Sequence, residues 1–162
     1  SDIIVIGLIR NPLSVMNSWL RAPKEFRKDL GWKESEEWKL ADKKNLDKEE
    51  ECYGCEKWKE VALLFEELKR KYNDKCYLIK YEDLLSNTER EVKKLFNFCN
   101  IKLTKQTLNF INKSSNTDQS GETYSVYRNK QNDRKWETQL NPNIISEIQK
   151  DLKGTDLEKY LG

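Results

Sequence analysis

Hydrophobic residues open the chain in an almost unbroken run, and a different period follows at once. Residues 3–9 are aliphatic except for one glycine, a pattern typical of a strand buried on both faces in a parallel sheet. The run stops at Arg10–Pro12, and proline suits the first turn of a helix because its φ is fixed and it lacks an N–H. Over residues 13–20 the apolar positions recur at helical spacing. The pattern therefore predicts a strand, a tight turn and a helix.

The longest periodic stretch lies over residues 56–72 and predicts an amphipathic helix. One stripe is apolar and the opposite face is charged; the stripe consists of Trp58, Val61, Ala62, Phe65, Leu68 and Tyr72. Residues 76–81 then predict a second strand. Because a helix lies between the two strands, the unit is βαβ and the strands should be parallel.

Three further helices are predicted from local signals. Thr88 with Glu91 forms the pattern of a capping box that opens a helix, and residues 103–111 form a short apolar period. Residues 113–131 lack such a period and predict a loop. Asn141 followed by proline is a helix cap with proline at the first helical position. The whole pattern predicts an α/β domain with parallel strands and a mostly helical remainder.

Composition limits the function classes. A length of 162 residues predicts one domain or part of a larger one. The 30 basic against 28 acidic residues give a net charge of +2, which argues against a dedicated nucleic-acid-binding protein. The sequence has no apolar stretch long enough for a membrane span and no histidine. The four cysteines include one C-x-x-C pair, at Cys52 and Cys55, and we interpret all four as ordinary thiols of a reducing, cytoplasmic compartment, with no metal site.

Residues 21–55 are a polar excursion between core elements. Charged residues dominate, and Trp32 and Trp38 are among the few large apolar groups. One interpretation is a solvated segment whose tryptophans pin it to the core. The other is a substrate-facing insertion, since long excursions in compact domains often form lids or binding loops.

Two stretches carry candidate anion-binding chemistry. Arg10 follows a strand directly and precedes a helix N-terminus, which is a natural anion site. A late basic segment contains Arg128 and Lys130 and is followed by Trp136. Arginine offers bidentate contacts to phosphate and lysine a mobile point charge; the alternative is a solvated loop fixed by its aromatic residues.

The spacing of Arg10 and Ser18, the sequence from Tyr81 to Leu84, and the segment from Arg128 to Leu140 together resemble the PAPS-dependent sulfotransferases (PAPS is 3′-phosphoadenylyl sulfate). The resemblance implies that Arg10 and Ser18 hold the 3′-phosphate of the nucleotide and that Tyr81 contacts its adenine region. It also implies that Arg128 and Lys130 close over the same phosphate.

The resemblance further implies a partial P-loop-type three-layer α/β/α fold and transfer of a sulfuryl group from PAPS to a hydroxyl or amine of a small-molecule or carbohydrate acceptor, leaving PAP, the 3′,5′-bisphosphate. The family's catalytic base and its P-loop-like 5′-phosphosulfate segment have no counterpart in residues 1–162. We therefore assign no catalytic residue, expect a truncated domain, and expect these residues alone to be inactive. Measurable turnover of PAPS by them would contradict this expectation.

Two other functions stay open at this point. The first is a non-catalytic nucleotide- or partner-binding module on the same scaffold. The second is a fragment of a P-loop small-molecule kinase, which should carry a metal-binding aspartate at a strand end; Asp83, the one candidate, lies past the strand end. The sequence does not indicate the acceptor or the oligomeric state.

Overall fold

The computed structural model of the protein describes residues 3–48, 50–116 and 133–162. They group into two compact units. The first contains residues 3–9 and 71–116, and the second contains residues 10–70 and 133–162. The first unit holds the sheet and the second holds the segment that starts at Arg10. Parallel strands with a mostly helical remainder confirm the predicted α/β class.

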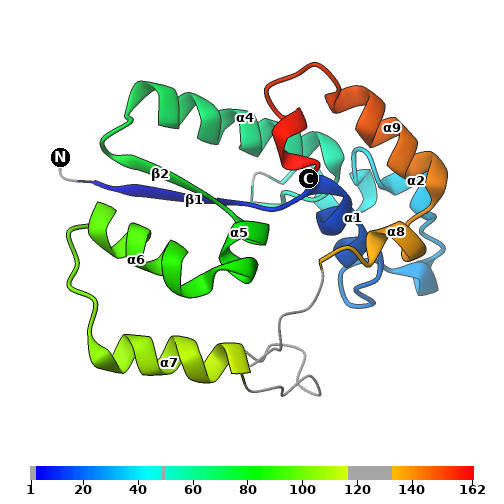
Figure 1. The fold of residues 1–162 in the computed structure, drawn as a ribbon. Coiled ribbons are helices and arrows are strands. Elements are labelled where there is room, and N and C mark those ends of the chain that lie inside the picture. Colours follow the sequence, from blue (N-terminus) through cyan, green and yellow to red (C-terminus); the bar gives the residue numbers. More distant parts are fainter. Residues whose placement is uncertain (1–2, 49, 117–132) are drawn as a thin grey trace. The chain divides into compact units, whose positions relative to one another are not determined.

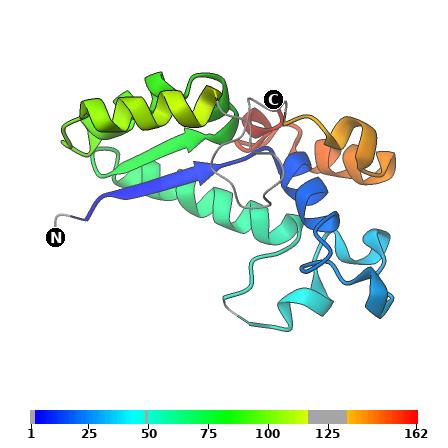
Figure 2. The same cartoon turned by 90° about the horizontal axis from the view of Figure 1, so that it is seen from below.

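The sheet of the first unit consists of two parallel strands in the described residues. Strand β1 (Val5–Ile9) pairs with β2 (Cys76–Lys80), in a register that sets Val5 beside Cys76 and Ile9 beside Lys80. Figure 2 shows the two arrows side by side and pointing the same way. Both strands therefore end at the same edge of the sheet.

One face of β1 differs from the prediction of a strand buried on both faces. Ile9 is 3% exposed, whereas Ile6 and Leu8 are 47% and 50% exposed. Successive side chains of a strand point to opposite faces, so alternate residues lie in the core and their neighbours lie at the surface. The prediction was wrong for this second face, because nothing in the described part of the chain covers it.

The helices of the first unit follow β2 in order. Helix α5 (Tyr81–Ser86) starts at the end of β2 and is followed by α6 (Thr88–Phe98) and α7 (Lys105–Asn116). Helix α6 packs against β2 on one side and α7 on the other (Figure 1). The rings of Tyr77 in β2 and Phe98 in α6 have centroids 5.1 Å apart. Helix α7 begins and ends later than the predicted span of 103–111.

The capping box predicted at the start of α6 is wrong. Thr88 is the first helical residue, and its hydroxyl donates to the carbonyl of Leu84 at 2.8 Å. The carboxylate of Glu91 accepts from Arg90 and Lys94, at 2.8 and 2.9 Å. Because α5 ends immediately before α6, a free carbonyl lies within reach of the Thr88 hydroxyl, which bonds it instead of capping.

The second unit is built from three longer helices, α1 (Pro12–Leu20), α4 (Cys55–Lys71) and α9 (Pro142–Leu152). Four short helical segments lie between them, η1 (Lys28–Leu30), α2 (Glu34–Glu37), α3 (Asp42–Asn45) and α8 (Trp136–Gln139), and η2 (Glu158–Tyr160) follows α9. Helix α1 packs against α8 and α9. Its apolar side is buried together with that of α9, through Leu13, Met16, Leu20, Ile148 and Leu152.

Local signals located the ends of two of these helices. Helix α4 matches the predicted span of 56–72 to within one residue at each end. The side-chain oxygen of Asn141 accepts from the backbone N–H of Asn143 at 2.9 Å, so the predicted cap of α9 is confirmed. A side-chain cap forms there because the cap residue is followed at once by proline, which needs no partner for its nitrogen.

An aromatic row fixes the polar excursion to α1. The ring of Trp19 lies 5.6 Å from that of Tyr53 and 5.5 Å from that of Phe26, and Phe26 lies 5.8 Å from Trp32, measured between centroids. Trp38 is only 7% exposed. The sequence analysis considered two roles for these tryptophans, fixing the excursion to the core or facing a substrate. The burial of Trp38 agrees with the first role.

The described residues contain no disulfide and no metal-binding cluster. None of the four cysteines is joined to another by a disulfide. Within residues 3–48, 50–116 and 133–162, no three acidic or sulfur side chains gather as metal ligands would. In the same ranges, every helix is too short or too polar to cross a bilayer.

Candidate functional site

The candidate site is built on the N-terminus of α1. Asn11 caps this helix, its side-chain oxygen accepting from the backbone N–H of Leu13 at 2.8 Å, and Pro12 is the first helical residue. The first turn holds no acidic side chain. The partial positive charge of the helix end is therefore unopposed within that turn, which favours an anion.

Arg10 adds a full positive charge at this end of the helix. Its guanidinium makes a two-point contact with the Asp133 carboxylate: Nε donates to Oδ2 at 2.8 Å and a terminal nitrogen donates to Oδ1. The two side chains are 31% and 14% exposed. Paired N–H groups of arginine match the oxygens of carboxylate and phosphate alike. The structure thus shows Arg10 oriented to bind an oxyanion.

Ser14 contributes to the same place. Its hydroxyl donates to the backbone carbonyl of Asp133 at 2.6 Å, and the residue is buried. Ser18 lies one turn further along α1 and is exposed. Residues four apart share a helix face, so Ser14 and Ser18 present hydroxyls along one side of α1.

Two side-chain contacts brace the backbone before α1. The indole N–H of Trp58, in α4, donates to the carbonyl of Arg10 at 3.1 Å. The side-chain amide of Asn11 donates to the carbonyl of Leu161 at 2.6 Å. Because each contact fixes the main chain beside Arg10, the guanidinium projects from a supported backbone.

A buried polar group lies on the neighbouring face of α1. The amide nitrogen of Asn17 donates to the side-chain oxygen of Gln139 at 3.0 Å. Its amide oxygen is buried and has no partner among the described residues. The contact with Gln139 ties the middle of α1 to the end of α8.

The sequence also predicted nucleotide-binding roles for Tyr81, Arg128 and Lys130. Tyr81 is half-buried and is the first residue of α5, in the unit that contains the sheet. Arg128 and Lys130 lie outside the described residues. Trp136, predicted to follow the basic segment, opens α8 and is half-buried. Of the predicted residues that the structure describes, Ser18 lies in α1 and Arg10 directly precedes the cap of that helix, whereas Tyr81 belongs to α5.

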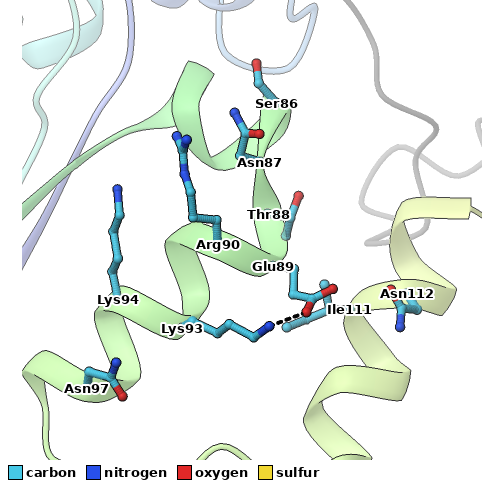
Figure 3. Close-up of a pocket in the computed structure, with 10 residues that line it drawn as sticks. All are labelled: Ser86, Asn87, Thr88, Glu89, Arg90, Lys93, Lys94, Asn97, Ile111 and Asn112. Carbon is cyan, nitrogen blue, oxygen red and sulfur yellow. Dashed lines mark hydrogen bonds and ion pairs between the residues drawn. The ribbon is translucent and has the colours of Figure 1, made fainter.

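A separate hollow lies in the first unit, between α6 and α7. It measures about 620 Å³ and is lined by three cations and several amide and hydroxyl side chains (Figure 3). Each of the cations pairs with a carboxylate: Arg90 and Lys94 with Glu91, and Lys93 with Glu89. Among the described residues that line this hollow, none is a predicted nucleotide-binding residue, and its three cations share two carboxylates.

Two residues of the site escaped the sequence analysis. Asp133 is an acidic residue beside a basic segment, and that contrast in charge was the available signal. Trp58 was predicted only as part of the apolar stripe of α4. Its role toward Arg10 depends on a contact between residues 48 positions apart, which no local pattern reveals.

Comparison with known families gives one match. A family model described as the sulfotransferase domain matches residues 1–160. The comparisons with curated proteins and with solved structures gave no match.

Proposed function

Because the chain belongs to the sulfotransferase domain family, which the family model matches over residues 1–160, we propose that it binds PAPS and PAP through the N-terminus of α1. In this proposal Arg10 and Ser18 hold the 3′-phosphate. The transferred group is a sulfuryl, passed from PAPS to a hydroxyl or amine of a small-molecule or carbohydrate acceptor.

The observation that carries the proposal is the oxyanion already held at Arg10. A guanidinium that takes a carboxylate through two N–H groups has the geometry to take two phosphate oxygens. The N-terminus of α1 adds backbone N–H groups of favourable polarity. The exposed hydroxyl of Ser18 is available to a phosphate lying along the same helix face.

The remaining nucleotide contacts are proposed from the family motifs. Tyr81 would lie against the adenine region, and Arg128 and Lys130 would add charge to the 3′-phosphate.

We assign no step of sulfuryl transfer to a residue of this chain. In-line transfer needs a base for the acceptor and cations at the 5′-phosphosulfate, and residues 1–162 contain neither the glycine-rich phosphate loop nor a histidine. We therefore propose that these residues bind the 3′-phosphate side of the nucleotide and do not turn over PAPS alone. An assay that detects PAP formation by them would overturn this point.

The first test is titration of PAP into wild type and Arg10→Ala. Charge-assisted hydrogen bonds contribute about 1.5–3 kcal/mol each, so we expect affinity to fall by roughly tenfold to a hundredfold. Arg70→Ala is the matched control because Arg70 is an exposed arginine of α4. Isothermal titration calorimetry should show PAP binding unchanged in this control.

A smaller loss is expected for Ser18→Ala, since a single neutral donor is removed. Equal PAP affinity in wild type and Arg10→Ala would contradict the assignment of Arg10. PAP binding without any sulfuryl transfer to the acceptors tested would instead favour a non-catalytic binding module.

Residues 21–55 are the proposed acceptor-facing segment. A hollow of about 400 Å³ lies where the segment leaves α1, with apolar walls from Leu20, Pro23 and Phe26 and charge from Arg27. Asp29, which also lines the hollow, pairs with Arg27, so the mixture suits a ligand with both apolar and polar parts. Hydrogen exchange of this segment should slow when an acceptor is bound, and unchanged exchange would contradict the proposal.

A further inference from the structure

We propose that Asp133 is a built-in competitor of the nucleotide at Arg10, so that binding exchanges a carboxylate for the 3′-phosphate and is weakened by that exchange. The inference rests on the proposed function, because it concerns the same arginine. It assigns to Asp133 a role in setting how tightly the nucleotide, and above all the product PAP, is held.

The geometry of the pair shows why the competition is direct. Asp133 uses Nε and a terminal nitrogen of Arg10, the same fork that binds a phosphate in two-point fashion. Both groups are partly shielded, with the carboxylate 14% exposed and the arginine 31% exposed. A phosphate and the carboxylate cannot occupy one fork together, since like charges at that distance repel.

Ser14 holds the competitor near the arginine. Its hydroxyl bonds the main-chain carbonyl of Asp133 at 2.6 Å, so residue 133 is fixed by its backbone independently of its side chain. The carboxylate can therefore leave Arg10 while residue 133 stays in place. The same arrangement lets a substitution of the side chain keep the backbone contact.

The size of the effect follows from a population argument. When a binding group is available in only a fraction of molecules, the apparent dissociation constant rises by the inverse of that fraction. For this partly shielded pair we take the upper end of the range for exposed ion pairs, about 1 kcal/mol, which corresponds to roughly fivefold in an equilibrium constant. Removing the competing carboxylate should therefore tighten PAP binding about fivefold.

The prediction depends on the ligand. PAPS and PAP both carry the 3′-phosphate, so Asp133 weakens both. AMP lacks that phosphate and can bind without displacing the carboxylate. The affinity for AMP should therefore not depend on Asp133, and the release of PAP should be slower when Asp133 is neutralised.

The experiment compares wild type, Asp133→Asn and Asp151→Asn by titration with PAP and with AMP. Asp151 is the matched control because it is an acidic residue of the same unit, lies in α9 and is ion-paired with Lys59 at 2.6 Å. The control removes the same charge at a distance from Arg10. Unfolding midpoints of all three proteins verify that each is folded.

We expect PAP to bind Asp133→Asn about fivefold more tightly, with AMP binding and Asp151→Asn unchanged. PAP affinity that stays equal or falls in Asp133→Asn overturns the inference, while a loss in Arg10→Ala would still support the proposed function. Equal tightening for AMP, or in Asp151→Asn, would show a general charge effect and also overturn it. Absence of PAP binding in every variant overturns both proposals.

Discussion

Two cysteines three residues apart have opposite surroundings. Cys52 is exposed, whereas Cys55 is the first residue of α4 and is 1% exposed. Burial raises the pKa of the Cys55 thiol to about 12, because a thiolate loses its hydration there. The two thiols of the C-x-x-C pair therefore differ in their exposure to solvent.

This contrast predicts selective alkylation. At pH 8 a thiol of pKa about 12 is ionised in about one molecule in ten thousand, and the thiolate is the reactive form. Iodoacetamide should modify Cys52 in the native protein and leave Cys55 intact, with both modified in denaturant; peptide mass spectrometry measures the sites. Equal native rates, or a disulfide between the two residues, would contradict this.

Single residues also show where local sequence information ends. Pro12 and Asn141 were placed correctly because a cap and a following proline act within three residues. The Arg10–Asp133 contact joins residues 123 positions apart. In the sequence, many other residues of opposite charge could pair with either of them. The sequence analysis could single out Arg10 as a candidate anion-binding residue, and it could not identify the carboxylate next to it.

At the scale of elements, the junction between the polar excursion and α4 is tightly packed. Gly54 has φ +89° and precedes α4. A Cβ there would lie 2.7 Å from the carbonyl oxygen of Lys39. That oxygen accepts from the N–H of Glu56 at 3.0 Å, so it cannot move without breaking the link between α2 and α4.

A comparison of two glycines tests this packing. Gly154 also has positive φ, +77°, but a Cβ there meets nothing within 4 Å. Gly154→Ala should therefore lower the free energy of unfolding only by the backbone cost of about 1–2 kcal/mol. Gly54→Ala adds a clash with main-chain atoms, so we expect about 3 kcal/mol or more.

Urea denaturation of both variants measures the difference. Similar losses of unfolding free energy in Gly54→Ala and Gly154→Ala would show that the hydrogen bond between Lys39 and Glu56 is easily displaced. In that case the excursion would not be held to α4 at this point.

Elements were predicted best where one period extends over many residues. The stripe of α4 and the parallel pairing of β1 with β2 follow from periodicity and from the length of the crossover. The capping box at Thr88 failed because its hydroxyl found the carbonyl of Leu84, an alternative that depends on how α5 ends. The short segments α2 and α3 have only four residues each, too few to display a period.

At the scale of the whole molecule, the sequence was sufficient to predict the family but not the surroundings of the first strand. Three short motifs in order suggested the sulfotransferases, and the match over residues 1–160 confirms the family. The predicted burial of both faces of β1 failed at Ile6 and Leu8. A face of this kind is completed by neighbours, and a strand's own sequence does not say whether those neighbours are present.

The hydrogen bond between Asn11 and Leu161 has a consequence for synthesis. It joins residues 150 positions apart, and closing so long a loop is slow and entropically unfavourable until other contacts form. On the ribosome, Leu161 is added 150 residues after Asn11. The nascent chain therefore carries Arg10 well before the main-chain support of its neighbour can form.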